Sequence, residues 1–135
     1  MPRHARMRRS EDFRRTVRHG VRAGRRTLVV HALRVGTYDE RRGDRAGSND
    51  QSTGSPLVGF VVSRSVGSAV RRNRVRRRLR HLILPHLSTL DDRTLVVVRA
   101  LPPAGTDDAR LGPDLEAAWE GVVRKLTGAD RRDRR

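Results

Sequence analysis

The residues with the clearest chemical potential are a run of arginines in the middle of the sequence. Seven of the ten residues from position 71 to position 80 are arginine, and the run contains no Asp or Glu. Like charges three or four residues apart on a helix repel one another, so an unpartnered arginine face lowers the stability of a fold. A polyanion removes that cost, because the planar guanidinium group binds phosphate oxygens in pairs and stacks on exposed bases. The run therefore favours a nucleic-acid surface over a solvated helix face.

A helix must position these arginines. Ser68 is a suitable N-cap, and Pro85 marks the end of the regular helix because the residue before a proline is pushed away from the helical region. At about 100° per residue, the apolar side chains between these limits fall within one arc and several polar ones fall roughly opposite. The apolar arc consists of Val75, Leu79, Leu82 and Ile83, and the opposite arc of Asn73, Arg74, Arg76, Arg77 and Arg80.

Length and charge limit the class of protein. At 135 residues one domain spanning 1–135 is expected, and the formal net charge of +16 favours a polyanionic partner and salt-sensitive association. The absence of Cys excludes disulfides, thiolate metal ligands and a cysteine nucleophile. The basic N-terminus is not followed by an apolar stretch, and no run approaches the roughly 18 apolar residues of a membrane span. We therefore expect a soluble, cytoplasmic protein with no membrane association.

Turn residues and hydrophobic patterning divide the rest of the chain. Ser10 has the properties of an N-cap, with Glu11 and Asp12 in the first turn, and Gly20 is expected to close this helix. The run from 94 to 100 is continuously apolar apart from one arginine and predicts a buried strand. A strand, the arginine helix and this strand form a crossover unit, so the two strands can lie parallel.

The sequence thus predicts an α+β fold in which a mixed four-stranded sheet packs with helices. The expected elements, in the order α-β-β-β-α-β-α, are a helix at 10–19, a brief pairing at 21–23, strands at 27–35 and 57–63, the arginine helix, a strand at 94–100 and a helix from Pro113 to Gly128 whose buried stripe includes Trp119. Outside these elements we expect a basic arm at 1–9, a flexible insertion at 36–56 joining two antiparallel strands, and a charged tail at 129–135.

No constellation of residues predicts catalysis by the protein itself. The five histidines have no metal-ligand spacing, and most carboxylates stand at helix starts or in loops, where capping and solubility explain them. A lone histidine in a strand, such as His31, is more often packed than catalytic. Phe13 and Val17 are four residues apart and share one helix face. We predict no catalytic residue and no metal site in the protein.

The ordered string from Ser63 to Arg80, SRSVGSAVRRNRVRRRLR, is more specific than its charge. It closely resembles the signature of the bacterial ribonuclease P protein component, the small basic subunit of the ribonucleoprotein that removes 5′ leaders from precursor tRNA. The segment RMRRSEDFRRTVRHG resembles the first helix of that family, and TLVVVRA resembles its last strand. The resemblance covers nearly the whole chain.

This resemblance implies a fold like that of ribosomal protein S5 domain 2 and a role as a protein cofactor. The catalyst would be a large RNA that holds Mg²⁺, and the protein would bind that RNA and the 5′ leader of precursor tRNA without an obligate protein partner. By position, the implied RNA-binding residues are Arg64, Arg71, Arg72, Asn73, Arg74, Arg76, Arg77 and Arg80. The implied leader-binding residues, in a cleft between the first helix and the sheet, are Phe13, Val17 and His31.

Val17 and His31 depart from the family pattern, because aromatic residues are often found at both positions, so base stacking should depend more on Phe13.

Three other classes of function remain open. A structural RNA-binding protein of the ribosomal type would bind RNA without a leader-dependent gain in cleavage. A DNA-binding helix protein would prefer duplex DNA, and a stand-alone metal nuclease would cleave with no added RNA.

Overall fold

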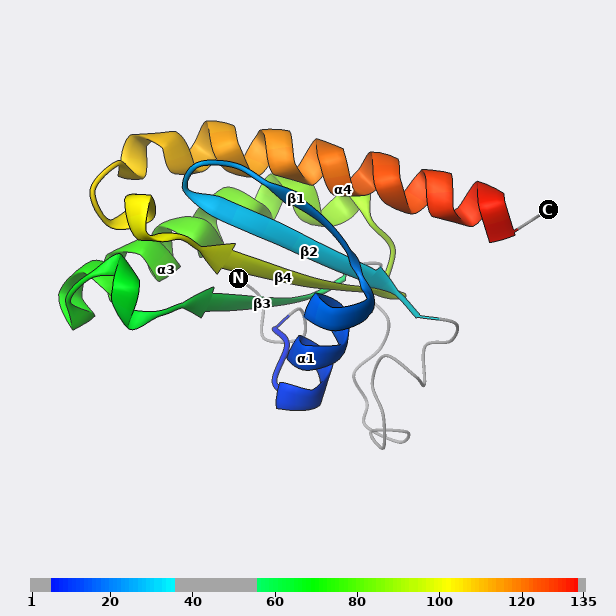
Figure 1. Cartoon of the computed structure of the whole chain (residues 1–135), viewed down its shortest axis with the longest axis horizontal. Coiled ribbons are helices and arrows are strands. Elements are labelled where there is room, and N and C mark those ends of the chain that lie inside the picture. The colour runs from blue at the N-terminus through cyan, green and yellow to red at the C-terminus, as the bar shows by residue number, and fades with distance from the viewer. Residues whose placement is uncertain (1–5, 36–55, 134–135) are drawn as a thin grey trace.

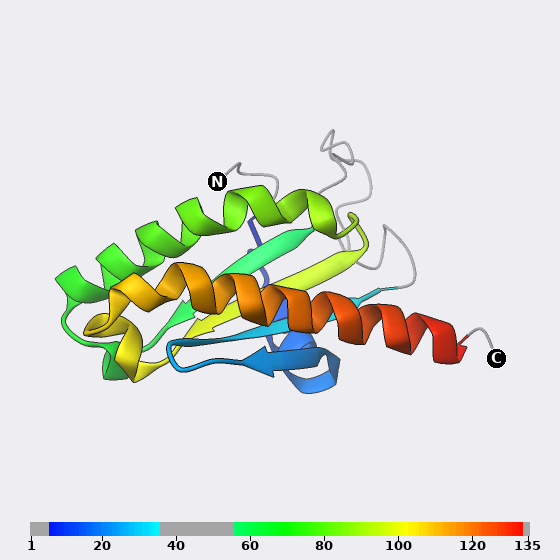
Figure 2. The same ribbon diagram turned by 90° about the horizontal axis from the view of Figure 1, so that it is seen from above.

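The structure is a computed structural model that describes residues 6–35 and 56–133, with side chains as far as residue 128. One sheet forms the middle layer of the molecule (Figures 1 and 2). Helices α3 (Ala69–Ile83) and α4 (Leu111–Asp133) cover one face of this sheet, and α1 (Ser10–His19) covers the opposite face. The two faces of the sheet therefore contact different helices, and each side of the molecule can present a different binding surface.

The sheet has four strands, as the sequence predicts. They are β1 (Val21–Gly24), β2 (Leu28–Arg34), β3 (Leu57–Val62) and β4 (Thr94–Ala100), in the spatial order β1-β2-β4-β3. β1 pairs with β2, and β2 with β4, in antiparallel register, whereas β3 pairs with β4 in parallel. The predicted parallel pair across α3 is confirmed. β2 and β3 run antiparallel as expected, but β4 lies between them.

Burial follows the pleat of the strands, because successive side chains point to opposite faces of a sheet. The larger core fills the space between the sheet and the helices α3 and α4, and Trp119 is part of it with 2% exposure. The smaller core lies on the other face, where Leu57, Leu95 and Val97 pack with Met7. β4 is buried on both faces because Val96 and Val98 enter the larger core and Leu95 and Val97 enter the smaller one, which explains its continuous apolar run.

A buried carboxylate ties α4 to the start of β2. Asp114 accepts hydrogen bonds from the backbone N–H of Thr27 (3.0 Å) and from its hydroxyl (2.6 Å). Both residues are buried, with 6% and 0% exposure. The carboxylate therefore satisfies a buried donor in another element, in addition to placing negative charge in the first turn of its own helix.

The limits of two helices differ from the prediction. Ser10 is the first residue of α1 rather than its cap: Arg9 takes the cap position, where its carbonyl accepts from the amides of Asp12 (3.1 Å) and Phe13 (3.3 Å). α4 begins two residues before Pro113, which the first turn of a helix tolerates because that turn needs no donor from it.

α4 also continues past Gly128 to Asp133, so the prediction that this glycine ends the helix is wrong. A glycine in a helix costs only about 1 kcal/mol relative to alanine, which is too little to end a long helix by itself. The first five residues of the predicted basic arm, the predicted insertion apart from Pro56, and the side chains of the predicted tail lie outside the described part of the chain.

Candidate nucleic-acid interface

The arginine helix begins at a tight turn. The hydroxyl of Ser68 accepts a hydrogen bond from the backbone N–H of Arg71 (3.2 Å), which confirms the predicted N-cap. Gly67, just before it, has φ 146°, the one positive φ in the part of the chain that the structure describes. A side chain there would be strained, so glycine is required for the entry into α3.

Two glycines also enclose the stem of Arg71. A Cβ atom on Gly67 would lie 2.8 Å from Cδ of Arg71. A Cβ atom on Gly105, in the turn after β4, would lie 2.0 Å from the carbonyl oxygen of Val66 and 3.4 Å from the same Cδ atom. The turns at 64–67 and 102–105 therefore hold the aliphatic part of Arg71 between them, while the residue as a whole stays exposed.

The arginines of α3 fall into two groups by burial. Val75, Leu79 and Ile83 are buried, as predicted. Five of the polar residues of the helix are exposed: Arg71, Asn73, Arg74, Arg77 and Arg78. Three others are half-buried along one flank of the stripe: Arg72, Arg76 and Arg80.

The expected position of Arg76 and Arg80 opposite the apolar arc is thus wrong, because at about 100° per residue Arg76 falls only about 20° beyond Ile83 and Arg80 about 60° beyond it, on the flank of the arc. Arg64, in the turn before the helix, is exposed as well. Within α3, the guanidinium of Arg76 donates to the side-chain oxygen of Asn73 (3.2 Å).

These charges are not neutralised within the described part of the chain. The ion pairs there, Arg26 with Asp107 and Arg34 with Asp91, involve none of the arginines of α3. The Nε atoms of Arg72 and Arg80 are buried without a hydrogen-bond partner. Guanidinium charges without a carboxylate partner are stabilised by an anion that their outer nitrogens can reach, so this surface of α3 is suited to bind an anion.

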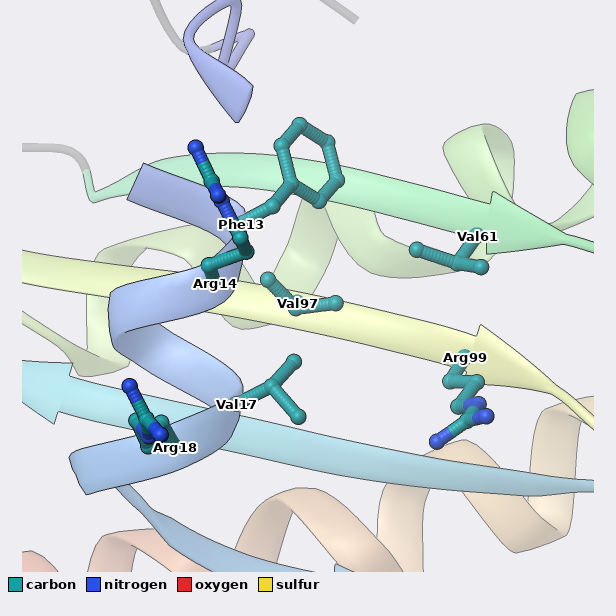
Figure 3. A pocket seen from close by; sticks show the side chains of 7 residues that line it. All are labelled: Phe13, Arg14, Val17, Arg18, Val61, Val97 and Arg99. Carbon is teal, nitrogen blue, oxygen red and sulfur yellow. The ribbon is translucent and has the colours of Figure 1, made fainter. Parts of the chain in front are cut away.

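A groove lies on the opposite face of the sheet, between α1 and the strands β3 and β4. Its volume is about 520 Å³. In Figure 3, Phe13 and Val17 reach it from the helix, and Val61, Val97 and Arg99 reach it from the sheet. Two further arginines of α1, Arg14 and Arg18, complete the lining. An apolar floor and an aromatic ring, surrounded by cations, can stack a base and hold its phosphates at the same time.

The position of Phe13 depends on the absence of a side chain in β3. A Cβ atom on Gly59 would lie 2.3 Å from Cζ and 2.5 Å from Cε1 of the Phe13 ring. The ring therefore lies directly against the strand. At the other end of α1, a Cβ atom on Gly20 would lie 2.5 Å from the carbonyl oxygen of Ala32, so this glycine is needed for close approach of helix and strand.

The structure brings Phe13 and Val17 together in the groove but does not place His31 there. His31 is 3% exposed, and neither ring nitrogen has a hydrogen-bond partner. Burial first, then the positive charges of Arg99 and Arg22, lower the pKa of His31. A neutral, enclosed ring of this kind supports the packing of the sheet, while Val17, with 39% exposure, remains accessible in the groove.

The three arginines of the groove were not among the residues predicted from the sequence. Arg99 had a signal, because it is the single charged residue in the strand TLVVVRA and the single exposed one in β4. Arg14 and Arg18 each follow one of the predicted groove residues and are four positions apart, so a helical projection places them beside Phe13 and Val17.

Among residues 6–35 and 56–133, no helix is long and apolar enough to cross a membrane. The same residues contain no group of three or more His, Cys, Asp or Glu side chains that could hold a metal ion.

Comparison with known proteins connects the chain to one family. A family model described as Ribonuclease P matches residues 1–125. The chain is 49% identical over 124 residues to the Ribonuclease P protein component of Streptomyces bikiniensis, which covers 91% of this chain and 95% of that protein. It is 47% identical over 124 residues, with the same two coverages, to the Ribonuclease P protein component of a Nocardioides species.

Solved structures with the same fold are more distant in sequence. The RNase P protein of Staphylococcus aureus superposes with a TM-score of 0.66 at 22% identity, covering 86% of this chain and 93% of that one. The RNase P protein of Thermotoga maritima superposes with a TM-score of 0.57 at 20% identity, covering 92% and 93%. The predicted α+β fold with a mixed four-stranded sheet is confirmed, and the chain belongs to the Ribonuclease P family.

Proposed function

We propose that this chain is a subunit of a ribonuclease P ribonucleoprotein that binds a catalytic RNA through α3 and the 5′ leader of precursor tRNA through the groove. The observation that carries the proposal is the presence of two cationic surfaces of different character on opposite faces of one sheet. α3 offers guanidinium groups without an aromatic residue, which suits the backbone of a folded RNA. The groove combines an aromatic ring with cations, which suits single-stranded RNA.

The RNA-subunit surface comprises the turn before α3 and the exposed and half-buried arginines of the helix. Its members are Arg64, Arg71, Arg72, Asn73, Arg74, Arg76, Arg77 and Arg80. Each guanidinium can hold phosphate oxygens in a bidentate manner, and together they exceed what exposed side chains need for solubility. Neutralising about five to eight phosphates would give a log–log salt slope of about −4 to −7.

The leader surface comprises Phe13 and Val17, with three arginines around them. Phe13 supplies the face on which a base stacks, and Val17 supplies a smaller apolar contact. Arg14, Arg18 and Arg99 supply charge for the phosphates on either side of that base. The buried position of His31 gives it a supporting place beneath this surface instead of a contact with the leader.

The protein contributes electrostatics and positioning to the cleavage, which is an endonucleolytic cut that gives the mature 5′ end of a tRNA. Precursor tRNA and the catalytic RNA are both polyanions, so their association is opposed by repulsion. A subunit of net charge +16 between them lowers that repulsion and reduces the Mg²⁺ needed for assembly. We assign the Mg²⁺ to the RNA, give no catalytic role to a protein side chain, and place the reaction in the cytoplasm.

The test is cleavage of a leader-bearing precursor tRNA at low Mg²⁺ by the protein alone, by the RNA subunit alone and by both together. The proposal requires cleavage that only the combination restores. Cleavage by the protein alone would instead assign catalysis to the protein. Tight RNA binding without any stimulation would favour a structural RNA-binding protein of the ribosomal type.

A further inference from the structure

The N-terminal segment adds an arginine to the face of the sheet that α3 covers. Arg6 forms a parallel bridge with Val58 of the edge strand β3, and the backbone N–H of Met7 donates to the carbonyl oxygen of Val58 (2.8 Å). Met7 is 4% exposed and packs in the smaller core, on the α1 side. Because neighbouring residues of an extended chain point to opposite faces, Arg6 points to the α3 side.

The half-buried arginines of α3 lie on that same side of the sheet. Arg72, Arg76 and Arg80 are four residues apart, so they form a straight row with a step of about 6 Å along the helix. The positive charges of Arg6 and Arg76 add to burial, the largest cause, in lowering the pKa of Arg80. Arg6 is therefore close enough to the row to act on it.

This cluster contains cations from two elements and no anion. Arg6 and the three arginines of the row form no ion pair with a carboxylate of the described residues. The buried Nε atoms of Arg72 and Arg80 have no acceptor. Like charges held together repel one another, and a phosphate group supplies the negative charge that offsets this repulsion together with acceptors for the outer guanidinium nitrogens.

We propose that Arg6, Arg76 and Arg80 form a clamp for one backbone phosphate of the RNA subunit, with Arg72 positioned for a neighbouring phosphate along the row. A polymer of phosphates matches a row of arginines better than a free anion does, because successive phosphates can engage successive turns of the helix. This inference rests on the proposed function, and it makes the N-terminal segment part of the RNA-subunit interface.

The test is binding of the RNA subunit by the full chain, measured as Kd at several salt concentrations. Arg6→Ala is expected to weaken binding about tenfold, as loss of a charge-assisted hydrogen bond does, and to reduce the salt slope by about one. Arg80→Ala should weaken binding to a similar extent. The Arg6→Ala/Arg80→Ala double variant should raise the Kd by less than the product of the two single increases. Arg8→Ala is the matched control, because Arg8 is an exposed arginine of the same segment that lies past the bridge with Val58 and is not among the charges that act on Arg80.

Equal effects of Arg6→Ala and Arg8→Ala, with independent effects of Arg6 and Arg80, would overturn the clamp and indicate diffuse attraction. Inorganic phosphate is the probe for the other source of this ligand: competition at concentrations well below those that act through ionic strength would assign the clamp to free phosphate. Arg77→Ala separates this inference from the proposed function. If Arg77→Ala weakens RNA binding and Arg6→Ala does not, only the clamp fails; if the unaltered chain does not bind the RNA subunit, the proposed function fails.

Discussion

Gly59→Ala tests whether the contact between Phe13 and β3 sets the affinity for the leader. The new Cβ atom would lie 2.3 Å from Cζ of the ring, whereas carbon atoms in contact are about 3.5 to 4.0 Å apart. The ring must therefore move by more than about 1 Å. Overpacking of this kind costs about 1 to 3 kcal/mol of unfolding free energy. A displaced ring also loses its stack with a base, worth about 1 to 3 kcal/mol, or about 5- to 150-fold in Kd.

The assay compares the Kd of the assembled ribonucleoprotein for precursor tRNA and for the same tRNA without its leader. The leader ratio, which is the Kd for the tRNA without its leader divided by the Kd for precursor tRNA, isolates the leader, since contacts with the tRNA body and the RNA subunit cancel. Gly59→Ala should lower this ratio nearly as far as Phe13→Ala does. Gly24→Ala is the control in β1, at the opposite edge of the sheet, because its Cβ atom would meet Val29 at an ordinary 3.6 Å.

The double variant Phe13→Ala/Gly59→Ala tests whether the clash with the ring causes the loss of both stability and leader affinity. Without the ring there is no clash, so Gly59→Ala should cost much less unfolding free energy in the Phe13→Ala background, measured by urea denaturation. The leader ratio should not fall further. A folded Gly59→Ala protein with an unchanged leader ratio would show that the position of the ring does not matter, and equal destabilisation in both backgrounds would show that the clash does not operate.

Contacts of Gly105, Asp114 and His31 can each be tested by a single substitution. Gly105→Ala should push the turn at 102–105 away from the turn at 64–67, displace Arg71 and so weaken RNA-subunit binding several-fold. Comparison of Kd values should show that this loss of affinity vanishes in the Arg71→Ala background. Asp114→Ala leaves the buried N–H of Thr27 without an acceptor and should lower the unfolding free energy by about 1 to 3 kcal/mol, measured by urea denaturation. His31→Phe should flatten the pH dependence of stability. Because the pKa of His31 is lowered in the folded protein, its contribution to the unfolding free energy is present above about pH 6.5, the ordinary value, and is lost as the pH falls through the lowered folded value. The unfolding free energy measured by urea denaturation should therefore decrease with falling pH more in the unaltered chain than in the variant.

The sequence predicted the fold well where local signals and packing agree. The periodicity of Val75, Leu79 and Ile83 locates the buried side of α3, and the apolar run of β4 locates the central strand, because burial on both faces leaves no alternation to detect. The sequence predicted the boundary at Gly128 poorly, since a glycine costs too little to end a helix by itself. It also placed residues 1–9 in a basic arm outside the folded elements, although Met7 belongs to the smaller core.

The sequence predicted which types of residue form the site but not which residues surround each of them. A helix projected at about 100° per residue puts Arg76 and Arg80 beside the apolar arc and not opposite it. The sequence prediction assigned both to the opposite face, whereas both are half-buried. Likewise, nothing local to Gly59 indicates that a ring 46 positions earlier lies against it.

Strand β3 explains how one small domain can present the two proposed RNA surfaces without a conflict between them. Val58 and Val62 point into the core beneath α3, while Gly59 and Val61 point to the groove beneath α1. The two surfaces are therefore separated by a single sheet, yet no side chain of β3 serves both of them. Two polyanions held in this way lie on opposite sides of a cationic layer, so each is attracted to arginines that the other does not occupy, and the protein reduces their mutual repulsion without making them compete for the same site.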